Sequence, residues 1–105
     1  MTIKQINDIK GIVNIARKGG FAIIGQDNLK KYCKKIYLVL FRDDCGESLI
    51  SIINNLKTKT KYEKIKLKHD EFTTITNIPA CKVVAFKNKA LSEKIIECIR
   101  GENIG

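Results

Sequence analysis

Residues Ile36-Tyr37-Leu38-Val39-Leu40-Phe41, written IYLVLF, form the longest continuous apolar run in the chain. Their aliphatic and aromatic side chains favour a strand. A strand with one face in water alternates apolar and polar residues, whereas this run contains no polar residue. Continuous apolar strands are typical of sheets that helices cover on both faces. The run therefore predicts a central strand in an α/β fold.

The residues before this run predict a helix, a short strand and a second helix. Thr2 and Gln5 have the spacing of a capping box, and apolar residues then recur at helical spacing over 3–18. A glycine-bounded apolar segment predicts a buried strand over 21–24. A polar segment with inward-spaced apolar residues predicts the second helix over about 25–34.

A capped helix and an exposed strand are expected after the central run. Asp44, with Glu47 three residues later, predicts the start of a third helix that ends before Lys57. Lysine then alternates with apolar residues over 64–68, which predicts a half-exposed strand. Lysines on such a strand also oppose aggregation through its edge.

The C-terminal third predicts the remaining elements. Asp70 is expected to cap a helix that runs through Ile75, and a loop over 76–80 leads into a strand over 82–86. The last helix is expected over 88–101, where Gly at its end supplies the stop. Helices and strands thus alternate with short connections. This order predicts one α/β domain over 1–105, a three-layer α/β/α sandwich around a four-stranded mixed sheet.

The charge of the chain favours an anionic partner. It has 20 Lys+Arg against 11 Asp+Glu, a net charge of +9 in 105 residues, and such an excess attracts phosphate backbones. Residues 57–68 carry six lysines and one glutamate, for which an edge-strand role and a nucleic-acid role both stay open. The apolar runs are too short for a membrane span or a signal peptide, so we expect a cytoplasmic protein that does not enter the membrane.

Catalytic and metal-binding patterns are absent from the sequence. The four cysteines form no C-x-x-C pair and have no neighbouring histidine, so they are expected to be free and no metal is predicted. His69 precedes a helix start, and Asp43 and Asp44 are expected to point apart. The sequence contains neither the G-x-x-x-x-G-K-[ST] pattern nor the G-x-G-x-x-G pattern of phosphate-binding loops. We therefore expect a non-enzymatic protein without cofactor or catalytic residue.

The start of the second helix is the strongest candidate for a binding site. Gly25 would let an anionic backbone approach the unpaired N–H groups of the helix, with Asp27 and Asn28 in the first turn and Lys31 one turn later. In the alternative interpretation, Gly25 only makes a turn and Asp27 only complements the helix dipole.

Four segments carry a resemblance to a known family: residues 12–20 leading to Gly25, residues 36–41, residues 82–86 and residues 90–95. They resemble the stand-alone bacterial YlxQ-like branch of the ribosomal L-seven-Ae/L-thirty-e family. The resemblance extends over about residues 8–98, nearly the whole chain. It implies an α/β/α sandwich that binds structured RNA, typically a kink-turn, in which a bulge is followed by sheared G·A pairs.

The resemblance also implies which residues would contact RNA. The family pattern Gly-x-Asn-Glu-x-x-Lys falls on residues 25–31, but Asp27 replaces Asn and Asn28 replaces Glu. Ionised Asp only accepts hydrogen bonds, whereas Asn both donates and accepts. Asn28 would therefore supply the donor that Asp27 lacks, so that the two positions exchange part of their chemistry. An apolar loop before the last strand would pack on an extruded base or ribose. The implied RNA contacts are Lys18, Gly25, Gln26, Asp27, Asn28, Lys30, Lys31, Lys34, Asn77, Ile78 and Pro79.

Two functions are therefore expected from different classes. The first is a monomeric, translation-associated protein that binds structured RNA, with ribosomal RNA among the candidates. The second is a protein-interaction or accessory module of the same fold that has lost kink-turn recognition; the replacement at Asp27 favours it and the lysine excess opposes it.

Overall fold

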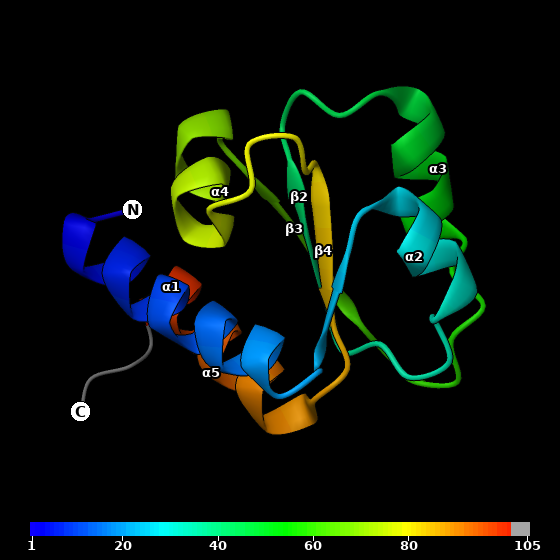
Figure 1. Ribbon diagram of the computed structural model, residues 1–105, viewed down its shortest axis with the longest axis horizontal. Helices are drawn as coiled ribbons and strands as arrows, with labels where there is room; N and C mark the ends of the chain where they lie inside the picture. The colour runs from blue at the N-terminus through cyan, green and yellow to red at the C-terminus, as the bar shows by residue number, and fades with distance from the viewer. Residues whose placement is uncertain (102–105) are drawn as a thin grey trace.

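The computed structural model describes residues 1–101, in which helices and strands alternate along the chain as predicted. Figure 1 shows the arrangement. The elements are α1 (Ile3–Lys18), β1 (Ala22–Ile24), α2 (Gln26–Lys31), β2 (Leu38–Arg42), α3 (Glu47–Asn54), β3 (Glu63–Leu67), α4 (His69–Thr76), β4 (Val83–Phe86) and α5 (Lys89–Arg100).

The sheet has four strands in the order β1-β4-β2-β3. β4 pairs antiparallel with both β1 and β2, and β2 pairs parallel with β3, so the sheet is mixed. β2 lies inside the sheet, and Leu38, Val39 and Leu40 are completely buried. The apolar run that predicts a central strand therefore forms one. β3 is the lysine-bearing edge strand, as the alternation over 64–68 predicts.

Helices cover both faces of the sheet, which confirms the predicted sandwich. α1, α4 and α5 lie on one face, where Val13, Phe72 and Ile95 pack against the strands in one core cluster. α2 and α3 lie on the other face, where Leu29 and Ile53 belong to a second cluster. None of the helices in residues 1–101 has the length and apolar composition that crossing a bilayer requires.

Several predicted helix ends are confirmed in atomic detail. Thr2 and Gln5 form the reciprocal capping box at α1, and the Asn88 side chain accepts from the Leu91 N–H at the start of α5. Gly101 ends α5 with a left-handed backbone at φ 69°. These signals act between residues close in the chain, so the sequence pattern identifies them directly.

Two predicted caps are wrong. α3 begins after Gly46 without a side-chain cap, because Asp44 instead accepts from Nε of Arg42 at 2.5 Å. α4 begins after Lys68, so Asp70 lies inside the first turn, where its charge suits the helix dipole. A cap prediction from spacing fails where a stronger charged partner lies nearby in the fold.

The connection between α2 and β2 is longer than predicted. α2 ends at Lys31 rather than near residue 34, and β2 begins at Leu38 rather than at residue 36. The Ile36 N–H donates to the hydroxyls of Thr58 and Thr60, both at 3.0 Å. Side chains from a distant segment thus replace the backbone partners that a strand would have provided at this position.

Candidate nucleic-acid interface

The two predicted RNA-contacting segments meet at one end of the sheet. β1 and β4 are antiparallel, so the end of β1 lies beside the start of β4, and the Gly25 N–H donates to the Val83 carbonyl at 3.1 Å. β2 also ends here, with the Arg42 N–H donating to the Lys82 carbonyl at 2.9 Å. We call residues 25–28, 42–47 and 77–82 the loop end; it lies at the top of Figure 1.

Gly25 is required by its backbone conformation rather than by space. Its φ of 88° and ψ of 158° fall in a region that essentially glycine alone occupies. A Cβ atom at this position would meet nothing within 4 Å. The residue therefore turns the chain from β1 into α2 and leaves an open approach to the first turn of α2.

Asp27 and Asn28 are both exposed in the first turn of α2. The Asn28 side chain is partly engaged, because its Nδ2 donates to the Ile24 carbonyl at 2.9 Å. This hydrogen bond ties α2 to the outer edge of β1 and leaves the Asn28 amide oxygen and one N–H free. The exposed Asp27 carboxylate offers two acceptor oxygens to a ligand but, when ionised, no hydrogen-bond donor.

Two arginines hold the loop between α4 and β4. Nη1 of Arg17 donates to the Thr76 carbonyl at 3.2 Å, and Nη1 of Arg42 donates to the Pro79 carbonyl at 3.2 Å. Asn77 ends α4 in the left-handed region, at φ 57°. The loop is therefore positioned from α1 and from β2 at once.

The side chains of this loop differ in how far they reach solvent. Asn77 and Pro79 are exposed, whereas Ile78 is half-buried and packs against the core cluster that includes Phe72. The predicted apolar surface is thus formed by Pro79 together with the outer part of Ile78.

Carboxylates surround the two segments, which the sequence interpretation did not anticipate. The loop end carries the acidic residues Asp27, Asp43, Asp44 and Glu47 against two basic residues, Arg42 and Lys82. The hydrogen bond from Arg42 lowers the pKa of Asp44, so this carboxylate stays ionised. Arg42 is itself only 7% exposed. The accessible part of the loop end is therefore acidic on balance.

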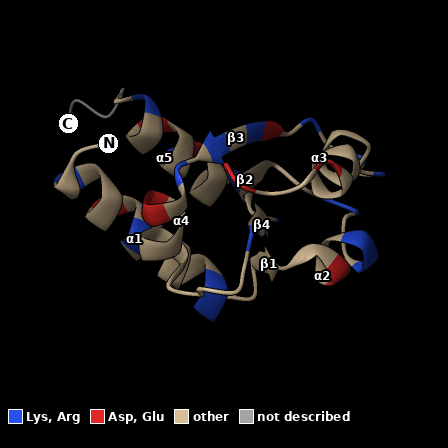
Figure 2. Cartoon of the chain, turned by 90° about the horizontal axis from the view of Figure 1, so that it is seen from above, with Lys and Arg blue, Asp and Glu red and all other residues tan. Residues whose placement is uncertain are grey.

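The remaining predicted lysines divide between two places. Lys30 and Lys31 lie in the last turn of α2, and Figure 2 shows α2 changing from acidic to basic along its length. Lys18 ends α1 and Lys34 precedes β2, so both lie at the opposite end of the sheet from Gly25. The structure does not bring Lys18 and Lys34 to the loop end.

Thiol and metal chemistry have little support in this region. Burial raises the pKa of the Cys45 thiol and the pKa of the Cys81 thiol, which keeps both protonated. Within residues 1–101, no three His, Cys, Asp or Glu side chains are grouped to hold a metal ion. His69 is exposed at the start of α4, as predicted.

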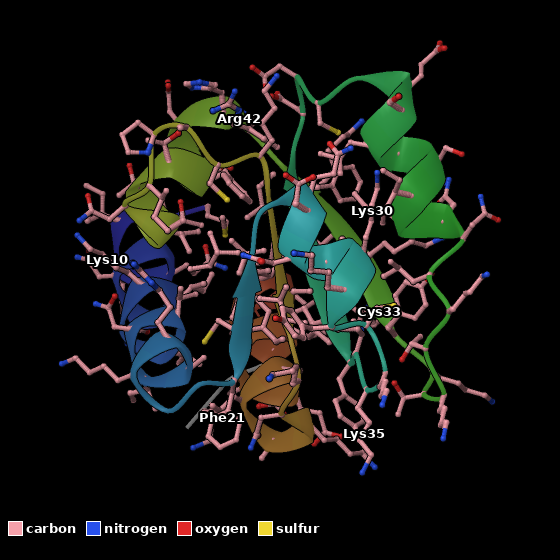
Figure 3. All side chains as sticks on the ribbon, turned by 45° about the vertical axis from the view of Figure 1, so that its right-hand side comes forward. Lys10, Phe21, Lys30, Cys33, Lys35 and Arg42 are labelled. Carbon is pink, nitrogen blue, oxygen red and sulfur yellow. The ribbon has the colours of Figure 1, made fainter. Side chains whose placement is uncertain are left out.

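Arg17 and Arg42 are the residues that sequence reasoning missed. Arg42 directly follows the apolar central run, and an arginine at that position was a signal that it serves as a buried anchor. Figure 3 places Arg42 above α2, at the end of the molecule where the loop lies. No such signal distinguished Arg17 from the other basic residues of α1.

Comparison with known proteins finds no family model that matches the chain and no curated protein that matches it.

Proposed function

We propose that this protein binds structured RNA, a kink-turn or a similarly bent RNA, through the loop end. The observation that supports this most is the adjacency of the α2 start and the loop over 77–80, which are about fifty residues apart in the chain. The resemblance described above implies these same two segments as one contact surface. The net charge of +9 supports a polyanionic partner.

The candidate contact residues each have a proposed role. Gly25 allows close approach of the RNA backbone, and the free groups of Asp27 and Asn28 read base edges. Beyond the loop end, Lys31 in the last turn of α2 holds a phosphate. Pro79 packs on an extruded base or ribose. We propose no catalytic step, and we place the function in translation, with ribosomal RNA as a candidate partner.

The test is a titration of labelled kink-turn RNA and of a straight duplex at about 50 and 200 mM salt. Lys31→Ala is expected to weaken binding to both RNAs and to reduce the salt slope by about 1. Lys94→Ala, at another exposed helical lysine, is the control and should leave both affinities unchanged.

Asn28→Ala is expected to weaken kink-turn binding about tenfold while leaving duplex binding unchanged, because a base contact carries the discrimination. Asn7→Ala, at an exposed asparagine of α1 that belongs to neither proposed RNA contact, is its control and should leave both affinities unchanged. Equal losses on both RNAs for Asn28→Ala would contradict the base-reading role.

The second candidate function is a protein-interaction module of the same fold. The acidic residues at the loop end favour it, because carboxylates beside a phosphate-binding surface oppose RNA binding. Its partner would present basic side chains to Asp27, Asp43 and Glu47. Failure of the kink-turn RNA to saturate the protein at about 0.1 M salt would favour this candidate over RNA recognition.

A further inference from the structure

A groove separates α2 from α3 on the face of the sheet that these two helices cover. Its volume is about 400 Å³, with Lys30 from α2 on one side and Lys57, which follows α3, on the other. Cys33 and Ile52 contribute to its lining. The lining of the groove thus combines two lysines with polar and apolar residues.

Three more lysines follow the lining residues Cys33 and Lys57 in the chain, where their two segments are joined. The Lys59 N–H donates to the Lys34 carbonyl at 3.0 Å, and the Thr58 hydroxyl donates to the same carbonyl at 3.2 Å. Lys35 follows in the chain, and Figure 3 shows Lys30, Cys33 and Lys35 one below another on this side. We call Lys30, Lys34, Lys35, Lys57 and Lys59 the lysine groove.

The chain segments that form the lysine groove contain no carboxylate of their own. Residues 30–37 and 55–62 contain seven lysines and no Asp or Glu. All five members are exposed, and none forms an ion pair with a carboxylate of residues 1–101. Adjacent chain segments lie about 5 Å apart, within the Debye length of about 8 Å at physiological salt, so the potentials of these lysines add.

The hollow on the other side of β3 has a different character. It lies against α5 and is lined by Glu63, Glu93 and Glu97 together with basic residues, and Arg100 pairs with Glu63 at 2.9 Å. Positive charge is neutralised there, so of these two hollows the lysine groove is the one that favours a polyanion.

We infer that the lysine groove binds the phosphate backbone of an unpaired RNA strand, a contact separate from the loop end. A groove with positive charge on both sides follows a linear chain of phosphates. An anionic membrane fits less well, because Ile52 and Leu56 pack against the core and are not free to insert into lipid.

Cys33 provides a direct readout of this groove. Its thiol is half-exposed, whereas Cys45, Cys81 and Cys98 are buried, so a thiol-alkylating reagent reacts first at Cys33. The experiment measures the alkylation rate of Cys33 by mass spectrometry with and without an oligouridine of about 12 nucleotides, which has no kink-turn. A saturating oligonucleotide is expected to slow the reaction at least about fivefold, since the bound strand covers the thiol.

A triple variant, Lys34→Gln, Lys57→Gln and Lys59→Gln, is expected to raise the Kd for this oligonucleotide at least tenfold at about 0.1 M salt. The salt slope should fall by about 2, because each phosphate contact on a single strand contributes about 0.7. The charge-matched control replaces Lys4, Lys66 and Lys94, which are exposed on α1, β3 and α5. Thermal unfolding of both variants establishes that they fold.

Equal losses for the two triple variants would overturn the inference, as would oligonucleotide binding that leaves the Cys33 rate unchanged. Protection of Cys33 by phosphatidylglycerol vesicles but not by the oligonucleotide would also overturn it and assign the groove to a membrane surface. If oligouridine protects Cys33 from alkylation but the protein binds kink-turn RNA no better than the straight duplex, only the proposed function is contradicted.

Discussion

The loop end and the lysine groove differ in how they are built and in what they carry. The loop end has four acidic and two basic residues, and two arginine side chains hold its main loop. The segments of the lysine groove carry seven lysines and no acidic residue, and threonine hydroxyls join them. The loop end therefore has a fixed loop geometry but few positive charges for an RNA backbone. The lysine groove has many positive charges but, within residues 1–101, no arginine side chain that fixes its segments.

This difference separates two tasks that RNA binding requires. Base and ribose contacts need positioned groups, whereas phosphate contacts need accumulated positive charge and tolerate imprecise geometry. Fixed loops supply the first and clustered lysines the second. If both proposals hold, selectivity depends on the loop end, and affinity and its salt dependence rest largely on the lysine groove.

The largest expected effect comes from breaking the anchor of the loop end. Arg42→Met keeps the apolar stem but removes the hydrogen bonds to Pro79 and Asp44, so it should cost about 2–3 kcal/mol of unfolding free energy. For a domain of this size that lowers Tm by about 10–20 °C. Thermal unfolding followed by circular dichroism measures it.

Arg100→Met is the control for this loss. Arg100 pairs with Glu63 on the surface, where both side chains are 47% exposed, and such pairs contribute about 0–1 kcal/mol. If the two substitutions lowered Tm equally, Arg42 would contribute no more than a surface ion pair. The proposal that Arg42 fixes the geometry of the loop end would then be wrong.

A smaller effect is expected from Asp44→Asn, and it should depend on pH. The pKa of Asp44 is lowered by Arg42, so ionised Asp44 stabilises the fold above its unfolded-state pKa of 3.8, and this stabilisation is lost as pH falls through the lower folded-state pKa. The variant should therefore have a lower Tm than the wild type near neutral pH.

The same comparison at acid pH contains its own control. As pH falls through the lowered pKa of Asp44, the carboxyl loses its charge and comes to resemble the amide, so the two Tm values should converge toward acid pH. A difference that stays constant from neutral to acid pH would show that the charge of Asp44 does not support the Arg42 anchor.

The smallest expected effect has the opposite sign and lies in the lysine groove. Lys34→Gln with Lys59→Gln removes like-charge repulsion between adjacent segments, so it should raise the unfolding free energy by about 0.5 kcal/mol at low salt. The gain should vanish at about 1 M salt, where the Debye length is about 3 Å.

Urea unfolding at both salt concentrations measures this gain. Lys4→Gln with Lys66→Gln serves as the control, because these lysines lie on different elements and should show no such gain. If Lys34→Gln with Lys59→Gln instead lowered the unfolding free energy, these lysines would stabilise the fold. The loop end would then not be the only one of the two regions whose charged side chains hold the structure together.

Local signals explain which parts of the fold were predictable. The caps at Thr2, Asn88 and Gly101 involve residues at most a few positions apart, and each prediction is confirmed. The caps at Asp44 and Asp70 were wrong. For Asp44 the reason is a stronger partner: spacing identifies a possible cap but not the Arg42 guanidinium that competes for the same oxygen.

The candidate site was predictable in part for the same reason. The Gly25 turn follows from a glycine between an apolar strand and a polar helix start. The grouping of Lys34 with Lys59 does not follow from sequence, because it depends on the parallel pairing of β2 with β3 and on two threonine hydroxyls. The sequence therefore did not show that Lys34 lies at the end of the sheet opposite Gly25.

The sequence by itself determined the alternation of helices and strands, the buried central strand and the lysine edge of β3, because hydrophobic periodicity and capping act over a few residues. Only the tertiary structure decided which charges face one another. Strand order and direction place Gly25 beside Val83 and Lys34 beside Lys59, at opposite ends of the sheet. Charge patterns over a surface arise from pairings between distant segments, which local sequence does not encode.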